Sequence, residues 1–69
     1  MYIHAQRIEA LMAEQGLTKR ALAVKCGISA QNIGTIIRRG TCEPRTVGKL
    51  AGGLGVPVAD ILPEVKSNA

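Results

Sequence analysis

Two amide side chains, Gln31 and Asn32, stand at the head of an apolar segment that ends in a pair of arginines, Arg38 and Arg39. An amide offers a hydrogen-bond donor and an acceptor together, which match the N6 and N7 atoms on the major-groove edge of adenine. Thr35, one helical turn later, can take a hydrogen bond or touch a thymine methyl group. Arginines suit phosphate groups. Side chains of these types occur on surfaces that read DNA. The alternative for the amides is an ordinary polar first turn of a helix.

Basic side chains are concentrated in the middle of the chain. Residues 19 to 49 hold seven of them and one acidic residue, a net charge of +6, whereas the whole chain carries +4. Such a segment indicates a polyanionic partner, or else a solvated positive face that only aids solubility. The basic residues are Lys19, Arg20, Lys25, Arg38, Arg39, Arg45 and Lys49, and the acidic one is Glu43.

The remaining titratable side chains form no catalytic or metal-binding pattern. His4 is the only histidine, and Cys26 and Cys42 show no CxxC spacing, so we expect no metal and no cofactor. Cys42 follows two arginines and could sense oxidants, but an incidental loop cysteine is the simpler interpretation. The acids are scattered and offer no pair or triad for acid–base or nucleophilic catalysis, which argues against an enzyme. They are Glu9, Glu14, Glu43, Asp60 and Glu64.

Composition argues against several classes of partner. Tyr2 is the only aromatic residue, so single-stranded nucleic acid held by stacked bases is not expected. The N-terminus has no uninterrupted apolar region of the kind found in signal peptides. The least polar run, residues 50–62, is too short to cross a bilayer, so we expect no membrane partner. Free cysteines suit a reducing cytosol, and we expect a cytoplasmic protein.

The spacing of apolar residues is helical throughout and predicts an all-α fold of five short helices. Sixty-nine residues make one domain, which we place at residues 1–63, followed by a flexible C-terminal tail at 64–69. Thr18 and Ser29 are good N-caps, and glycines mark the helix ends. The predicted helices cover residues 2–15, 19–25, 30–38, 45–54 and 58–62.

The third and fourth predicted helices have distinct apolar patterns. Ile33, Ile36 and Ile37 share one face of the third helix, because they are spaced at i, i+3 and i+4. The fourth helix contains three glycines, which lower its intrinsic helix propensity. Tertiary packing must therefore hold it, and the glycines allow a close helix contact. These glycines are Gly48, Gly52 and Gly53.

Residues 18–29 read T-K-R-A-L-A-V-K-C-G-I-S, two helices joined by a very short turn at Gly27. With the segments RIEALMAEQGLTKRALAVKCGIS, NIGTII, EPRTVGKLAGGLGV and VADIL, the chain resembles the Cro and repressor type of helix-turn-helix domain over about residues 5–62. Such domains occur in lambdoid phage repressors and many bacterial regulators. The resemblance implies a lambda-repressor-like five-helix bundle that binds double-stranded DNA as a symmetric homodimer.

The resemblance also implies residue roles. Base-reading positions of the family fall on Ala30, Gln31, Asn32 and Thr35, although a glutamine is common at the first of them. Ala30 can offer only an apolar contact. The loop after the third helix is often basic in the family, but here it is not, so phosphate contact is expected to shift to neighbouring residues. The expected phosphate-binding residues are Lys19, Arg20, Arg38, Arg39, Thr41, Arg45 and Lys49.

Two further expectations concern apolar contacts. Many family members bury an arginine–glutamate pair at the positions held here by Met12 and Ile37, so an apolar contact is expected to replace it. The C-terminal part supplies a candidate dimer surface, although Ile61 and Leu62 could instead cap the core. The candidate dimer residues are Val56, Val58, Ile61, Leu62 and, further along, Val65.

These features together predict a sequence-specific regulator of transcription that binds double-stranded DNA, of the repressor type found on prophages or other mobile elements. No small-molecule ligand is expected. A protein-interaction module on the same scaffold, such as an antitoxin-like or adaptor protein, is the alternative.

Overall fold

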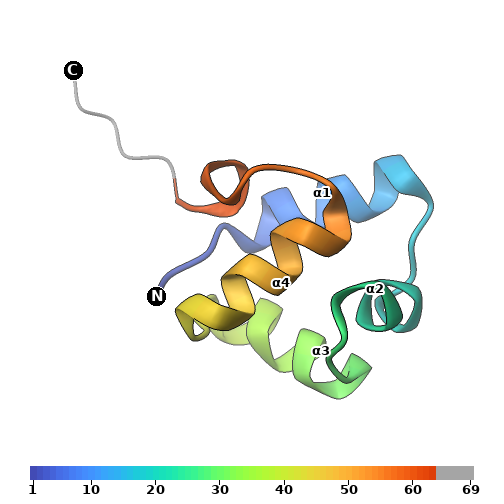
Figure 1. Ribbon diagram of the computed structural model, residues 1–69, viewed down its shortest axis with the longest axis horizontal. Coiled ribbons are helices and arrows are strands. Elements are labelled where there is room, and N and C mark those ends of the chain that lie inside the picture. The colour runs from blue at the N-terminus through green and yellow to red at the C-terminus, as the bar shows by residue number, and fades with distance from the viewer. Residues whose placement is uncertain (64–69) are drawn as a thin grey trace.

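The computed structural model describes residues 1–63, which form four α-helices and one 3₁₀ turn (Figure 1). The helices are α1 (Ala5–Gln15), α2 (Lys19–Cys26), α3 (Ala30–Arg39) and α4 (Pro44–Leu54), and the turn is η1 (Val58–Ile61). The all-helical prediction is therefore confirmed. The expected fifth helix is only a 3₁₀ turn, and Leu62 lies beyond it. The predicted tail, 64–69, lies outside the described residues.

The start of the chain differs from the prediction of a helix from residue 2. The backbone N–H of Ile3 donates to the carbonyl of Gly40 at 2.9 Å, and the N–H of Cys42 donates to the carbonyl of Met1 at 2.9 Å. The first residues thus lie extended beside the loop that follows α3. Ile3 is buried there, so a distant backbone segment and the core together outweigh local helix propensity.

Local side-chain caps fix where the helices begin. The hydroxyl of Thr18 accepts a hydrogen bond from the N–H of Ala21 at 3.0 Å, and Ser29 accepts from Asn32 at 3.0 Å. Such bonds satisfy N–H groups that have no partner within the first helical turn. Glu43 precedes α4 without a capping bond from its side chain. The predicted starts of α2 and α3 agree with these caps.

The core draws on all four helices and on η1. Ile8, Leu22, Ile33, Leu50 and Ile61 are almost completely inaccessible to solvent. Among the described residues no polar or charged side chain is buried. The fold is therefore held by apolar packing and contains no buried ion pair in residues 1–63.

The positions expected to replace that ion pair lie at or against the core. Met12 is buried on α1, and Ile37 on α3 is half-buried and packs against the core. The predicted register requires Ile37 to face the protein interior, and its packing against the core agrees with this. The direct contact between Met12 and Ile37 stays a prediction.

The close helix contact that the glycines of α4 allow occurs at Gly53 alone. A Cβ added at Gly53 would collide with the Sγ of Cys26 and lie 3.3 Å from the backbone nitrogen of Cys26 on α2. A Cβ added at Gly48 or at Gly52 would meet no heavy atom within 4 Å. Gly53 therefore lets α2 and α4 approach, and the other two glycines have no such packing role in residues 1–63.

Candidate nucleic-acid interface

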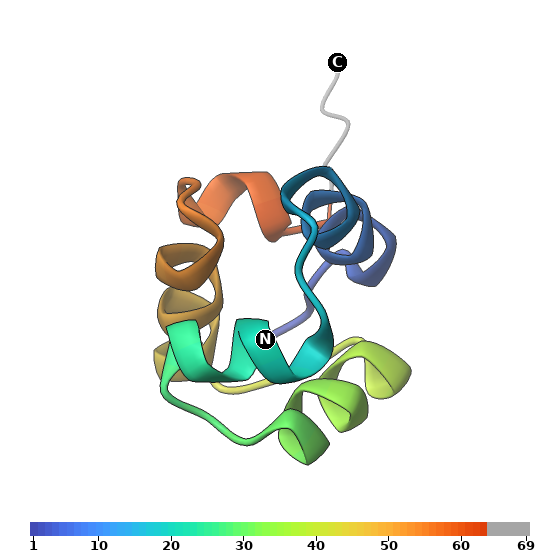
Figure 2. The same ribbon diagram turned by 90° about the vertical axis from the view of Figure 1, so that its right-hand side faces the viewer.

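The site begins with the turn between α2 and α3. Gly27 has a positive φ of 74°, in the left-handed region that glycine enters without a steric penalty. Ile28 packs against the core beneath the turn, and Ala23 is buried where α2 meets its neighbours. Ser29 then caps α3 directly. This is the geometry of a helix-turn-helix, which leaves α3 at one edge of the molecule, opposite η1 (Figure 2).

The two faces of α3 differ sharply in chemistry. Ile33 and Ile36 are buried, as their spacing predicted. Gln31 and Asn32 are exposed in the first turn, and the C-terminal turn exposes two arginines. The amides thus lie on the solvent-facing side of a helix whose other side is buried in the core.

The other two predicted base-reading residues are less open. Ala30 is half-buried and packs against the core, so only part of its methyl group faces outward. Thr35 is also half-buried, and its hydroxyl donates a hydrogen bond to the backbone carbonyl of Gln31 at 3.1 Å. A hydroxyl has one hydrogen, so Thr35 retains its methyl group and its acceptor capacity for a partner.

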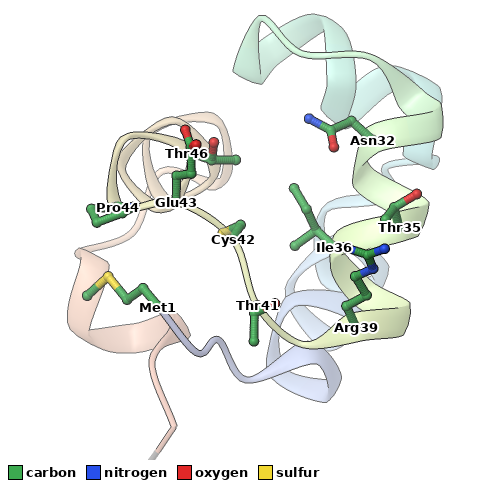
Figure 3. A pocket seen from close by; sticks show the side chains of 10 residues that line it. All are labelled: Met1, Asn32, Thr35, Ile36, Arg39, Thr41, Cys42, Glu43, Pro44 and Thr46. Carbon is green, nitrogen blue, oxygen red and sulfur yellow. The ribbon is translucent and has the colours of Figure 1, made fainter.

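An open hollow of about 630 Å³ lies between α3 and the start of α4 (Figure 3). Asn32 points from α3 across this hollow towards Thr46 and Glu43, whereas the hydroxyl of Thr35 points away from them. Sequence periodicity could not find the hollow, because it depends on how α4 is placed relative to α3. Its lining residues are Met1, Asn32, Thr35, Ile36, Arg39, Thr41, Cys42, Glu43, Pro44 and Thr46.

The basic residues predicted to bind phosphates are distributed over three helices and are all exposed. Two stand at the start of α2, two at the end of α3, one at the start of α4 and one in its middle. Thr41, the uncharged member of the set, is half-buried and forms an isolated antiparallel bridge with Tyr2. The basic residues are Lys19, Arg20, Arg38, Arg39, Arg45 and Lys49.

The candidate dimer residues occupy different environments. Ile61 is fully buried, so its side chain belongs to the core and not to a dimer surface, which corrects that expectation. Val58 is 38% exposed. Val56 and Leu62 are half-buried and pack against the core. Val65 lies outside the described residues.

No group of three or more His, Cys, Asp or Glu side chains among the described residues could hold a metal ion. Burial raises the pKa of the Cys42 thiol, so less of it is present as the reactive thiolate than at a solvent-exposed cysteine. Within residues 1–63, none of the helices combines the length and the apolar character that a bilayer-spanning segment needs.

A family model described as helix-turn-helix matches residues 8–61, which is most of the chain and includes all of α2, α3 and α4. No curated protein and no solved structure matches the sequence.

Proposed function

Since the chain belongs to the Cro/repressor-like helix-turn-helix family of DNA-binding regulators, we propose that it binds specific sites in double-stranded DNA with α3 in the major groove. The observation that carries this proposal is the division of α3 into two faces. Ile33 and Ile36 are held in the core, while Gln31 and Asn32 are exposed at the helix start, where helices of this motif meet base edges.

Base reading in this proposal depends chiefly on the two amides. Gln31 and Asn32 can each pair in a bidentate way with adenine, and such a pair discriminates against wrong bases by about 1–3 kcal/mol. Ala30 contributes an apolar contact at most. Thr35 contributes its methyl group or an acceptor, because its hydrogen is donated to the backbone.

Affinity in this proposal comes first from phosphate contacts. The exposed basic residues flank α3 on the two neighbouring helices as well as on α3 itself. Each neutralised phosphate releases condensed counterions, so binding weakens as the salt concentration rises. Thr41 can donate a hydroxyl hydrogen bond to a phosphate without adding charge.

A single small domain has a limited interface, so we propose that the protein acts as a homodimer on two half-sites about 34 Å apart, one turn of B-DNA. Val58 is the exposed apolar residue of the proposed dimer surface, and Val56 and Leu62 are its half-buried members. The repressor role, the origin on a mobile element and the location in the cytoplasm belong to this same proposal. Binding should need no cofactor and no small-molecule ligand.

Selection of bound sequences from a random DNA library tests the proposal. We expect a short motif rich in adenine–thymine pairs, repeated with two-fold symmetry at a spacing of about one helical turn. Recovery of no enriched motif, with binding that depends only on salt, would reject sequence-specific reading. An enriched motif without symmetry would reject the dimer and leave base reading intact.

A further inference from the structure

Gly34 occupies the interior of α3, where nothing in residues 1–63 requires a glycine. Its φ is not positive, unlike that of Gly27, so its backbone conformation suits any residue. A Cβ added there meets no heavy atom within 4 Å, unlike one added at Gly53. Glycine in a helix interior is less stable than alanine. The fold therefore loses stability at Gly34 and gains no close contact within the described chain.

Two of the four neighbours of Gly34 on the helix surface belong to the predicted base-reading residues. Residues three and four positions apart are neighbours on a helix, which places Ala30, Gln31, Ile37 and Arg38 around Gly34. Gln31 and Arg38 are exposed, whereas Ala30 and Ile37 are half-buried and pack against the core. Bare backbone thus lies between an apolar border and a polar one.

The border of Gly34 formed by Ala30 and Ile37 offers only apolar side chains, whereas Gln31 and Arg38 on the other side carry hydrogen-bond donors. The hydroxyl of Thr35 donates its hydrogen to the carbonyl of Gln31, and Ala30 has only a methyl group. The C5-methyl of thymine is the apolar group that a base pair displays in the major groove. The bare backbone of Gly34 and its apolar border of Ala30 and Ile37 match this group.

We propose that a thymine C5-methyl group packs against the backbone of α3 at Gly34, in the space that a side chain would fill. The inference rests on the proposed function, in which α3 enters the major groove. It assigns Gly34 as a specificity-determining residue that reads by shape, in addition to the amides that read by hydrogen bonds.

The test is a cycle of one protein change and one DNA change on the selected site. Each thymine of the half-site is replaced in turn by deoxyuridine, which lacks only the C5-methyl group. For the wild-type protein we expect one replacement to weaken binding about fourfold, the effect of one buried methyl group. In Gly34→Ala the new methyl group competes for the same space. We expect this variant to bind the thymine site at least tenfold more weakly.

The decisive result is the combination of the two changes. Gly34→Ala should bind the deoxyuridine site better than the thymine site, which reverses the preference of the wild-type protein. Gly52→Ala is the matched control, because Gly52 is also helical and open but lies near the end of α4. It should keep the wild-type affinity and the wild-type preference.

Thermal unfolding separates these effects from damage to the fold. Both alanine variants should unfold at a higher temperature than the wild-type protein, because each replaces an open helical glycine. If the wild-type protein binds the thymine and deoxyuridine sites equally well, and Gly34→Ala does too, the inference is wrong. Base reading by the amides would still stand. Failure of the wild-type protein to select any site would instead reject the proposed function.

Discussion

The hydroxyl of Thr35 is hydrogen-bonded to the backbone carbonyl of Gln31, at 3.1 Å, on the same exposed side of α3 that carries the amide of Gln31. This bond fixes the side chain of Thr35 and uses the only hydrogen that it could donate to a base. It makes an apolar or acceptor contact the expected contribution of Thr35 to a DNA complex. The structure of the free protein thus restricts what this position can read.

Substitution of Thr35 separates its methyl group from its hydroxyl. Thr35→Val keeps the shape and should bind the selected site within about twofold of the wild-type protein. Thr35→Ser keeps the hydroxyl and loses the methyl group, which should weaken binding about fourfold. Titration of both variants against the same DNA measures the two effects. Weaker binding by Thr35→Val than by Thr35→Ser would mean that the hydroxyl reads the base.

Gly53 should be the glycine of α4 that tolerates alanine least. Gly53→Ala places a methyl group against Cys26 on α2, and overpacking of this kind costs about 1–3 kcal/mol of the free energy of unfolding. Gly48→Ala and Gly52→Ala should instead stabilise the protein by up to about 1 kcal/mol, because their Cβ positions are open. Urea unfolding of the three variants compares them directly. If Gly53→Ala stabilised the protein, α2 and α4 would have to lie further apart at this point than the contact between Gly53 and Cys26 indicates.

The N-cap of α3 can be tested against a helix start that has no side-chain cap. Ser29→Ala removes the hydrogen bond to the N–H of Asn32 and should cost about 1 kcal/mol of the free energy of unfolding. Glu43→Ala removes no capping bond at the start of α4 and should change stability by less than about 0.5 kcal/mol. Chemical denaturation measures both. Similar losses for the two variants would contradict the cap assignment.

Dimerisation is expected to depend on Val58 and not on Ile61. Val58→Glu places a charge on the proposed dimer surface and should leave the protein folded but monomeric in sedimentation across a concentration range. Ile61→Ala removes fully buried side-chain volume and should cost about 2–5 kcal/mol of the free energy of unfolding. If the wild-type protein and Val58→Glu sediment alike at every concentration, the proposed surface is not the dimer interface.

Signals that act within a few residues made much of the fold predictable. Thr18 and Ser29 cap helices locally, and glycines end them, so the bounds of α2 and α3 were predicted within one residue. Features that depend on distant segments were not predictable. The extended start of the chain depends on pairing with the loop at residues 40–42. The choice of Gly53 among three glycines depends on where α2 crosses α4.

The same distinction applies to the candidate interface. Helical periodicity sufficed to place Gln31 and Asn32 on the exposed face of α3. It could not show that Asn32 points across a hollow towards the start of α4, because that hollow arises from the packing of two helices (Figure 3). Nor could it show that the hydroxyl of Thr35 bonds to the backbone, since this depends on a side-chain rotamer.

The central claim is that α3 reads bases while the basic residues around it bind phosphates. The most direct measurement is the affinity of Gln31→Ala and Arg38→Gln for the selected site and for random DNA across a range of salt concentrations. Arg7→Gln is the matched charge control, because Arg7 lines a hollow beside η1, and η1 lies at the opposite edge of the molecule from α3 (Figure 2).

Gln31→Ala should lose about 1–3 kcal/mol on the selected site alone, with an unchanged salt dependence. Arg38→Gln should weaken binding to both DNAs and reduce the slope of log affinity against log salt by about 0.9. Arg7→Gln should leave the affinity for both DNAs and the slope against salt nearly unchanged. Equal losses on selected and random DNA for Gln31→Ala would contradict the claim that α3 reads the sequence.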